Sequence, residues 1–226
     1  MISQMYSEEK KAGGFTLLEL LIVVSIIAIL SVALIFVLNP AETLKKSRDA
    51  QRISDLATLK TSLALYASST STPYLGSSNS NTGCKATPTS PSTSIFYSMA
   101  SSTGILSGTP VDGSGGTTVT WSATSSPLTD GTGWIPVNLD TLTGGSPISN
   151  LPVDPVNTAT STIANPATYT YRYACSVNPI AFEIDAALES TAYTVTDNKL
   201  ISDGGNNPNY YEVGTNLKII GNGTAF

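Results

Sequence analysis

The chain has 226 residues, a net charge of −5, only 12% charged residues and no histidine. This length suffices for one ordinary domain plus an accessory segment, and it can bury a core without help from metals or disulfides. The lack of histidine excludes Ser-His-Asp and Cys-His catalytic arrangements and removes the commonest zinc ligand. After residue 67 the chain has four basic residues against ten acidic ones, so this part offers no general surface for nucleic acid.

The first element is a long apolar segment that we expect to form a transmembrane helix. No charged residue occurs from Leu20 to Ala41, and Glu19 is the only one in residues 15–38. As a helix, residues 15–38 would be ~36 Å long, which is enough to cross a hydrocarbon core of ~30 Å. A secretory signal has its small-residue cleavage site after the apolar run. Here Gly13-Gly14 and Lys10-Lys11 precede that run.

Glu19 is an anomaly inside this apolar segment. A carboxylate at the centre of a membrane helix costs about 3 kcal/mol on insertion scales, and less near the end where Glu19 lies. If the chain were cut after Gly14, the new α-amino group of Phe15 would lie four positions before Glu19. In an array of parallel helices, that cation could pair with the acid of a neighbouring chain.

Residues 10–20, KKAGGFTLLEL, closely resemble the leader and cleavage region of type IV prepilins and type II secretion pseudopilins. The resemblance extends over roughly residues 10–40. It implies that a prepilin peptidase removes residues 1–14 as a cytoplasmic leader, cuts between Gly14 and Phe15, and methylates the new N-terminus at Phe15. It also implies that Glu19 serves assembly. The alternative is an ordinary signal anchor.

The same resemblance implies a structural role and no enzymatic activity. The expected function is that of a subunit of a type IV pilus-like filament or a type II secretion pseudopilus. The expected partners are other copies or other pilins, the prepilin peptidase, the inner-membrane assembly platform and the membrane. The chain would cross the inner membrane once, with its head outside, and then enter a periplasmic or cell-surface filament. A minor or tip pilin that acts as an adhesin, or that binds DNA or another ligand, is the alternative.

The orientation follows from the leader and not from the distribution of charge. Lysines and arginines near a membrane span favour the cytoplasmic side. The four basic residues at positions 45–52 outnumber Lys10 and Lys11, so charge alone would leave the orientation open or reverse it. The leader places the N-terminus inside.

Pro40 is expected to end or kink the first helix, because it lacks an N–H group and disfavours helix at the preceding residue. We therefore expect residues 15–39 to form the membrane or filament-core helix and residues 40–67 to form an amphipathic helix of the head. Residues 41–67 contain neither glycine nor proline. Lys60 is the only charged member of the apolar stripe predicted for this helix, and Arg48, Arg52 and Asp55 lie mostly away from it. The apolar members of the stripe are Ile53, Leu56, Ala57, Leu63, Ala64 and Ala67.

Residues 68–226 are expected to form a β-rich head with long Ser/Thr/Gly loops, so the fold class is α+β: a pilin fold, in which a long kinked helix packs on an antiparallel sheet. A hairpin turn is predicted at Asn178-Pro179. Strands are predicted at Thr117–Trp121, Tyr169–Ser176, Ala181–Ser190, Tyr210–Val213 and Leu217–Ile220, and a short helix or strand at Ile95–Met99. Alternation within Ala181–Ser190 favours a solvent-facing row of Glu183, Asp185 and Glu189 rather than an acid/base set.

Two further features have alternatives that the sequence leaves open. Cys84 and Cys175 could form a disulfide worth roughly 4–5 kcal/mol, or remain two buried thiols. The segment Leu151–Asn157 resembles a Leu-Pro-x-Asp-Pro segment of major pseudopilins, although a rigid turn would explain it equally well.

No cofactor is required by the sequence. The major pseudopilins, which this chain resembles, have a calcium site in their C-terminal loops. Oxygen ligands for Ca²⁺ could come from Asp197, Asp203 and Asn206, which would also suit plain turns.

Overall fold

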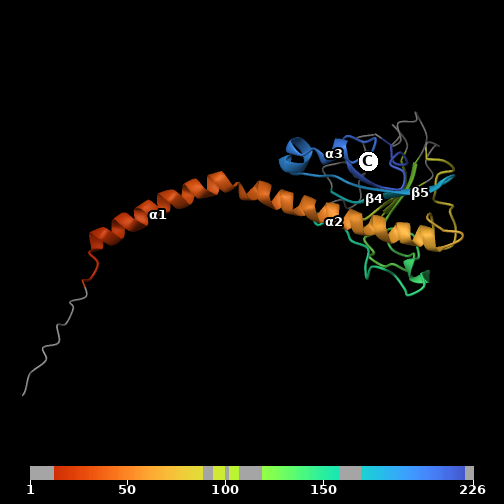
Figure 1. Cartoon of the computed structure of the whole chain (residues 1–226), viewed down its shortest axis with the longest axis horizontal. Coiled ribbons are helices and arrows are strands. Elements are labelled where there is room, and N and C mark those ends of the chain that lie inside the picture. The colour runs from red at the N-terminus through yellow and green to blue at the C-terminus, as the bar shows by residue number, and fades with distance from the viewer. Residues whose placement is uncertain (1–12, 89–93, 100–101, 107–118, 158–168, 222–226) are drawn as a thin grey trace, which may run out of the picture. The chain divides into compact units, whose positions relative to one another are not determined.

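The computed structural model of the chain describes residues 13–88, 94–99, 102–106, 119–157 and 169–221. The chain divides into two compact units, Met1–Thr43 and Leu44–Phe226. Helix α1 (Leu17–Leu38) belongs to the first unit, and helix α2 (Pro40–Ser69) carries the chain into the second (Figure 1). Asn39 between them has a left-handed conformation, with φ 39°. Pro40 is the first residue of α2, where its missing N–H is not needed. The predicted break at Pro40 is therefore confirmed.

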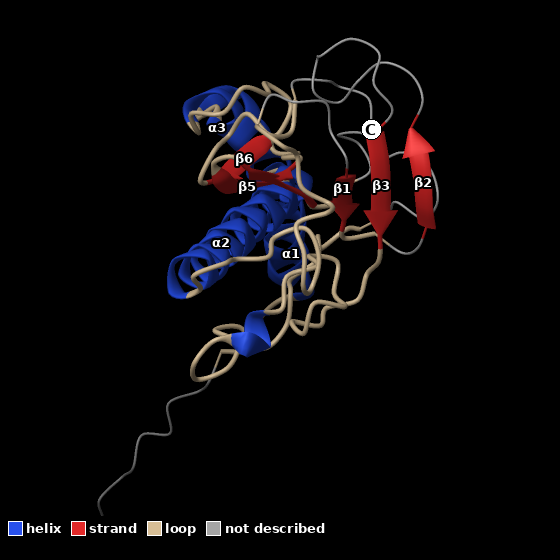
Figure 2. Ribbon diagram, turned by 90° about the vertical axis from the view of Figure 1, so that its right-hand side faces the viewer, coloured by secondary structure: helices blue, strands red, loops and turns tan. Residues whose placement is uncertain are grey.

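The second unit contains a six-stranded sheet with strand order β2-β3-β1-β4-β5-β6. The strands are β1 (Ser94–Tyr97), β2 (Ser102–Leu106), β3 (Val119–Ala123), β4 (Arg172–Val177), β5 (Ile180–Ala186) and β6 (Tyr211–Gly214). Neighbouring strands are antiparallel except β1 and β3, which are parallel. The α+β class and the turn at Asn178-Pro179 are confirmed, whereas β2 was not predicted. Short helical turns occur at η1 (Leu139–Thr141), η3 (Ala192–Thr196) and α3 (Lys199–Ser202), and α3 lies beside β6 (Figure 2).

Helix α2 packs on one face of this sheet through a stripe of large apolar side chains. The stripe is Leu56, Leu59, Leu63 and Tyr66, spaced at three, four and three residues, and all four are buried. They meet Tyr173, Phe182 and Ile184 of the sheet in one core cluster. The sequence prediction was correct for Leu56 and Leu63 but missed Leu59 and Tyr66. It was wrong for Ala57, which is exposed.

The opposite face of the sheet is also buried, and its side chains are largely polar. Arg172, Glu183, Asp185 and Glu212 are all at most 1% exposed. The prediction that Glu183 and Asp185 face solvent is therefore wrong. Strand alternation was correct, but the loop before β6 and the segment after it cover this face, and Ile220 from that segment is buried.

The segment Leu217–Ile220 forms a turn, so the strand predicted there is wrong. Its backbone N–H groups do not enter a strand ladder. Instead, the Glu183 Oε2 atom accepts hydrogen bonds from the Ile219 N–H at 2.6 Å and from the Ile220 N–H at 2.9 Å. The buried Glu183 carboxylate thus satisfies backbone N–H groups that would otherwise need partners in a strand. The apolar sequence pattern alone assigns this segment to the sheet.

A buried arginine clamp fixes α2 to the loops of the head. Arg52 donates to Asp154 at 2.7 Å, to Asp49 at 2.7 Å and to Glu189 at 2.8 Å. Arg48 also binds Glu189, at 2.6 Å. The expectation that Arg52 lies away from the packed face is therefore wrong. The prediction that Glu189 faces solvent is also wrong, because its side chain is only 5% exposed. Hydrogen bonds from Arg48, and further ones from Arg52, hold the pKa of Glu189 below its ordinary value.

The clamp also accounts for the Leu151–Asn157 segment. Besides binding Arg52, the Asp154 carboxylate accepts the Val156 N–H at 2.8 Å. The Asp154 carboxylate therefore stabilises its own turn and binds Arg52 of α2 at the same time. These two structural contacts account for an aspartate at this position.

We predict that Arg52→Met lowers the free energy of unfolding by about 3–5 kcal/mol, because the buried carboxylates of Asp49 and Asp154 would lose their cation. Arg48→Met is the matched control, since Arg48 is 33% exposed and pairs only at the edge of the clamp. It should cause a much smaller loss. Denaturant unfolding of the detergent-solubilised chain measures both variants, and similar small losses would contradict a clamp centred on Arg52.

Cys84 and Cys175 are joined by a disulfide that links residues 91 positions apart. Cys175 lies in β4, and both side chains are buried. The bond therefore ties the loop that follows α2 to the centre of the sheet.

We predict that replacing both cysteines with alanine lowers the free energy of unfolding by about 4 kcal/mol in the chain-entropy description of a loop of this length. Denaturant unfolding with and without reductant measures the effect. The reduced wild-type chain should be weakened similarly, whereas an unfolding midpoint insensitive to both treatments would contradict this role.

Candidate functional site

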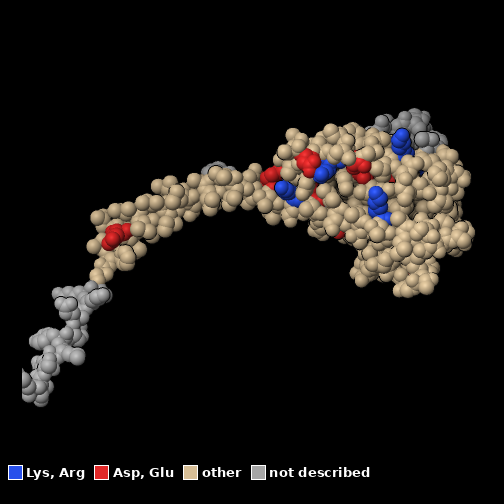
Figure 3. Space-filling model, viewed as in Figure 1, with Lys and Arg blue, Asp and Glu red and all other residues tan. Residues whose placement is uncertain are grey.

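Helix α1 is the part of the chain that the sequence assigns to a membrane or a filament core. Residues Leu17–Ile35 have a mean hydropathy of 2.9, and none of this span is buried inside the structure. The 22 residues of α1 correspond to ~33 Å of helix, close to the ~30 Å of a hydrocarbon core. Glu19 is the only charged residue of α1, and Figure 3 shows an uncharged surface along the helix apart from one acidic spot. By length and composition, α1 can cross a membrane.

The polar side chains along α1 are compatible with an apolar environment. Ser25 donates its hydroxyl hydrogen to the Ile22 carbonyl at 2.8 Å, and Ser31 donates to the Ile27 carbonyl at 2.7 Å. A hydroxyl that bonds its own helix needs no partner from water. Both serines can therefore lie among lipids or apolar side chains.

A capping box begins α1 and gives Glu19 a contact within its own chain. The Glu19 N–H donates to the Thr16 Oγ1 at 3.2 Å, and the Glu19 Oε2 accepts from the Thr16 N–H at 3.5 Å. An acid in the first turn also interacts favourably with the helix dipole. Sequence reasoning missed this contact, although Thr16-Leu17-Leu18-Glu19 has the spacing of a capping box.

The residues before the capping box are open. A side chain built at Gly13 or Gly14 would meet no other heavy atom within 4 Å, and Phe15 is 85% exposed. These residues have no regular secondary structure. Nothing in the described chain therefore obstructs access to the Gly14–Phe15 peptide bond, and nothing in its packing requires glycine there.

The three residues considered for calcium have other contacts or face solvent. Asp197 pairs with Lys199 at 2.8 Å. The two carboxylate oxygens of Asp203 accept the N–H groups of Gly205 and Glu212, and Asn206 is exposed. Within the described ranges, no group of three or more His, Cys, Asp or Glu side chains could hold a metal ion. The arrangement offers no clear fit for an ion, and calcium binding stays a prediction.

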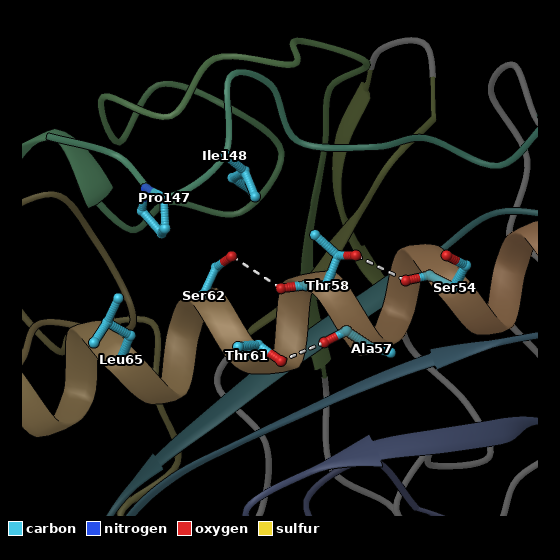
Figure 4. Close-up of a pocket in the computed structure, with 8 residues that line it drawn as sticks. All are labelled: Ser54, Ala57, Thr58, Thr61, Ser62, Leu65, Pro147 and Ile148. Carbon is cyan, nitrogen blue, oxygen red and sulfur yellow. Dashed lines mark hydrogen bonds between the residues drawn. The ribbon is translucent and has the colours of Figure 1, made fainter.

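A groove with a volume of about 400 Å³ runs along α2 opposite Pro147 and Ile148 (Figure 4). Its lining includes no charged residue: Ser54, Ala57, Thr58, Thr61, Ser62, Leu65, Pro147 and Ile148. The hydroxyls of Thr58, Thr61 and Ser62 each donate to a carbonyl four residues earlier in α2, at 2.9 Å. These hydroxyls have no adjacent base in the lining, so the groove lacks the features of a nucleophilic active site.

Comparison with known proteins gives one match, confined to the N-terminal segment. Residues 10–35 match the family model of the prokaryotic N-terminal methylation motif. No curated protein and no solved structure matches the chain. The motif is the signature of type IV prepilins and pseudopilins, a structural family, and it implies processing by a prepilin peptidase and assembly with other pilins. The chain therefore has the N-terminal motif of type IV pilin-like and pseudopilin proteins over residues 10–35.

Proposed function

We propose that the chain is a structural subunit of a type IV pilus-like filament or a type II secretion pseudopilus. The observation that carries the proposal is the methylation motif on an apolar helix of which no part of the span is buried by the rest of the described chain. The precursor would insert with its head outside, lose residues 1–14 between Gly14 and Phe15, and pass from the bilayer into a filament.

Apolar burial alone does not favour the filament over the membrane. Lipid tails cover the side chains of α1 in the bilayer, and the helices of other subunits would cover the same surface in a filament. Because both surroundings are apolar, the transfer yields little net hydrophobic free energy. A polar contact at the end of the helix, where Glu19 lies, would favour the filament over the bilayer.

The Glu19 carboxylate has bonding capacity left for a partner from another chain. Its two contacts with Thr16 are both 3.5 Å long, which is beyond the usual range of hydrogen bonds. Cleavage after Gly14 would create an α-amino group on Phe15. In a site without water, an ion pair between that group and the Glu19 of a neighbouring subunit would be much stronger than in water.

We predict that Glu19→Gln is inserted and processed normally but enters filaments roughly tenfold less, as expected for a loss of about 1.4 kcal/mol per subunit contact. Glutamine can still form a capping box, so this variant removes the charge and retains the start of the helix. Thr16→Ala is the matched control because it removes the capping hydroxyl and keeps the acid. The ratio of subunit in sheared filaments to subunit in membranes measures both.

Two results would count against the ion pair. A normal filament yield from Glu19→Gln would show that the charge is not needed. An equal loss in Thr16→Ala would assign the effect to helix capping.

We predict that Gly14→Val prevents processing without affecting the fold, because a side chain at Gly14 meets nothing in the chain itself. Any loss of cleavage would therefore reflect the fit of the segment to the peptidase. Gly13→Val is the control, since it lies in equally open space one residue farther from the cut. Electrophoretic mobility distinguishes precursor from mature chain, and efficient processing of Gly14→Val would place the cut elsewhere.

A minor or tip pilin, with a head that recognises a surface or a ligand, is the second candidate. Glu19 favours the shaft, because a subunit at the tip can dispense with the contact that this acid would make. The number of copies per filament distinguishes the two: a shaft subunit is repeated along the filament, and a tip subunit occurs once.

A further inference from the structure

Two glutamates on the second face of the sheet lie next to each other on neighbouring strands. Glu183 of β5 is opposite Gly214 of β6, and Glu212 of β6 is opposite Asp185 of β5. Glu183 and Glu212 are therefore diagonal neighbours on one face, which is within reach of long side chains. Gly214 leaves the place opposite Glu183 without a side chain, so the two carboxyl groups can meet there.

Both carboxyl groups are buried, and only one of the two oxygens of each accepts hydrogen bonds. Glu183 is 0% exposed and Glu212 is 1% exposed. One oxygen of each accepts backbone N–H groups: Glu183 Oε2 from Ile219 and Ile220, and Glu212 Oε2 from Asn207 at 2.9 Å. The Oε1 atoms of both have no hydrogen-bond partner within the part of the chain that the structure describes. Two adjacent buried carboxylates in this state would repel each other strongly.

No cation from the described residues balances this pair. Arg172 is a buried base on this face, and its Nε donates to the Asp185 Oδ1 at 2.7 Å, so the guanidinium is paired with that aspartate. The Arg172 Cζ atom also lies 3.5 Å from the centre of the Tyr210 ring. Lys85, which is also buried and lies beside Ser176 of β4, donates from its Nζ to the Pro88 carbonyl at 3.5 Å. A further acid, Asp203, accepts the Glu212 N–H at 2.8 Å.

We propose that Glu183 and Glu212 share one proton, and that this pair is a pH-sensitive latch that holds residues 217–221 and the loop at 203–209 against the sheet. A single proton between the two groups gives both unsatisfied oxygens a partner and removes one of two adjacent charges. Loss of that proton would leave two charges in contact. Residues 217–221 and the loop at 203–209 would then move away from the sheet, which would admit water to the two carboxylates and relieve their repulsion.

The environment of the pair favours retention of the proton. Burial raises the pKa of Glu212 to about 7 and raises the pKa of Glu183 well above its ordinary value. The neighbouring Glu212 carboxyl raises the pKa of Glu183 further, whereas Glu183 acts in the opposite direction on Glu212. The charge of Asp185 raises the pKa of both groups, and that of Asp203 raises the pKa of Glu212. Backbone N–H groups of Ile220 and Asn207 act in the opposite direction.

The sign of the pH dependence follows from these shifts. An unfolded glutamate has a pKa of about 4.3, so between about pH 4.3 and about pH 7 the folded pair binds more protons than the same groups in the unfolded chain. Its contribution is fully present below about pH 4.3 and is lost as the pH rises through about 7. For one group with these two pKa values, opening becomes about thirtyfold more frequent between about pH 5.5 and about pH 8.

Hydrogen exchange of the full chain in detergent micelles tests the latch. After correction for intrinsic exchange rates, protection of the Ile219 and Ile220 amides should fall about thirtyfold between about pH 5.5 and about pH 8. Glu212→Gln supplies a permanent donor to Glu183 and should abolish this dependence. Asp197→Asn, which removes an exposed carboxylate, should retain it.

Infrared spectroscopy of the wild-type chain tests the shared proton independently of any variant's folding. At about pH 6, a carbonyl band of a protonated, non-exchanging carboxylic acid should be present, and Glu212→Gln should lack it. The proposal is overturned if the wild-type band is absent, or if Glu212→Gln retains the full pH dependence. It is also overturned if added Ca²⁺ and chelator control the protection of Ile219 and Ile220 at constant pH, because a metal ion would then join the two carboxylates.

Discussion

The structure depends on one constraint. The side chains of α1 are apolar around the circumference of the helix, and nothing in the described chain buries its span. Such a surface has to be covered by lipid or by the helices of other molecules. Its hydroxyls bond back to the helix, and its one acid lies in the first turn against Thr16. The helix is therefore suited to both surroundings, and a change at its N-terminus can decide between them.

In the proposed function, the head has to stay folded while α1 passes from the bilayer into a filament. Its own core fulfils this requirement, because α2 and the sheet bury a continuous apolar cluster that needs no residue of α1. The arginine clamp and the Cys84–Cys175 disulfide add links between α2, its following loop and the sheet. On the second face, the fold depends on pairing between polar groups, which makes that face sensitive to protonation in a way that the apolar core is not.

Sequence was most informative where the determinants are local. The length of the apolar run, the position of Pro40 and the alternation in β4 and β5 each predicted an element correctly. The contacts of Arg52 could not be predicted, since Asp154 and Glu189 lie 102 and 137 positions away along the chain. Alternation likewise identified Glu183 and Asp185 as sharing a face but could not reveal that a later segment covers it. The strand predicted at Leu217–Ile220 was wrong for the same reason: the backbone of this segment bonds to the side chain of Glu183 in β5, a contact between residues far apart in the sequence.

The central claim is that the chain matures as a filament subunit through its N-terminal segment. Mass spectrometry of the intact protein and of its N-terminal peptide, recovered from the native membrane and from filaments, tests this claim most directly. The account predicts a mature chain that begins at N-methylated Phe15 in both fractions. An unprocessed chain, or one cut after Leu38, would contradict it, because the protein would then be an anchored or secreted domain and Glu19 would have no amino group to pair with.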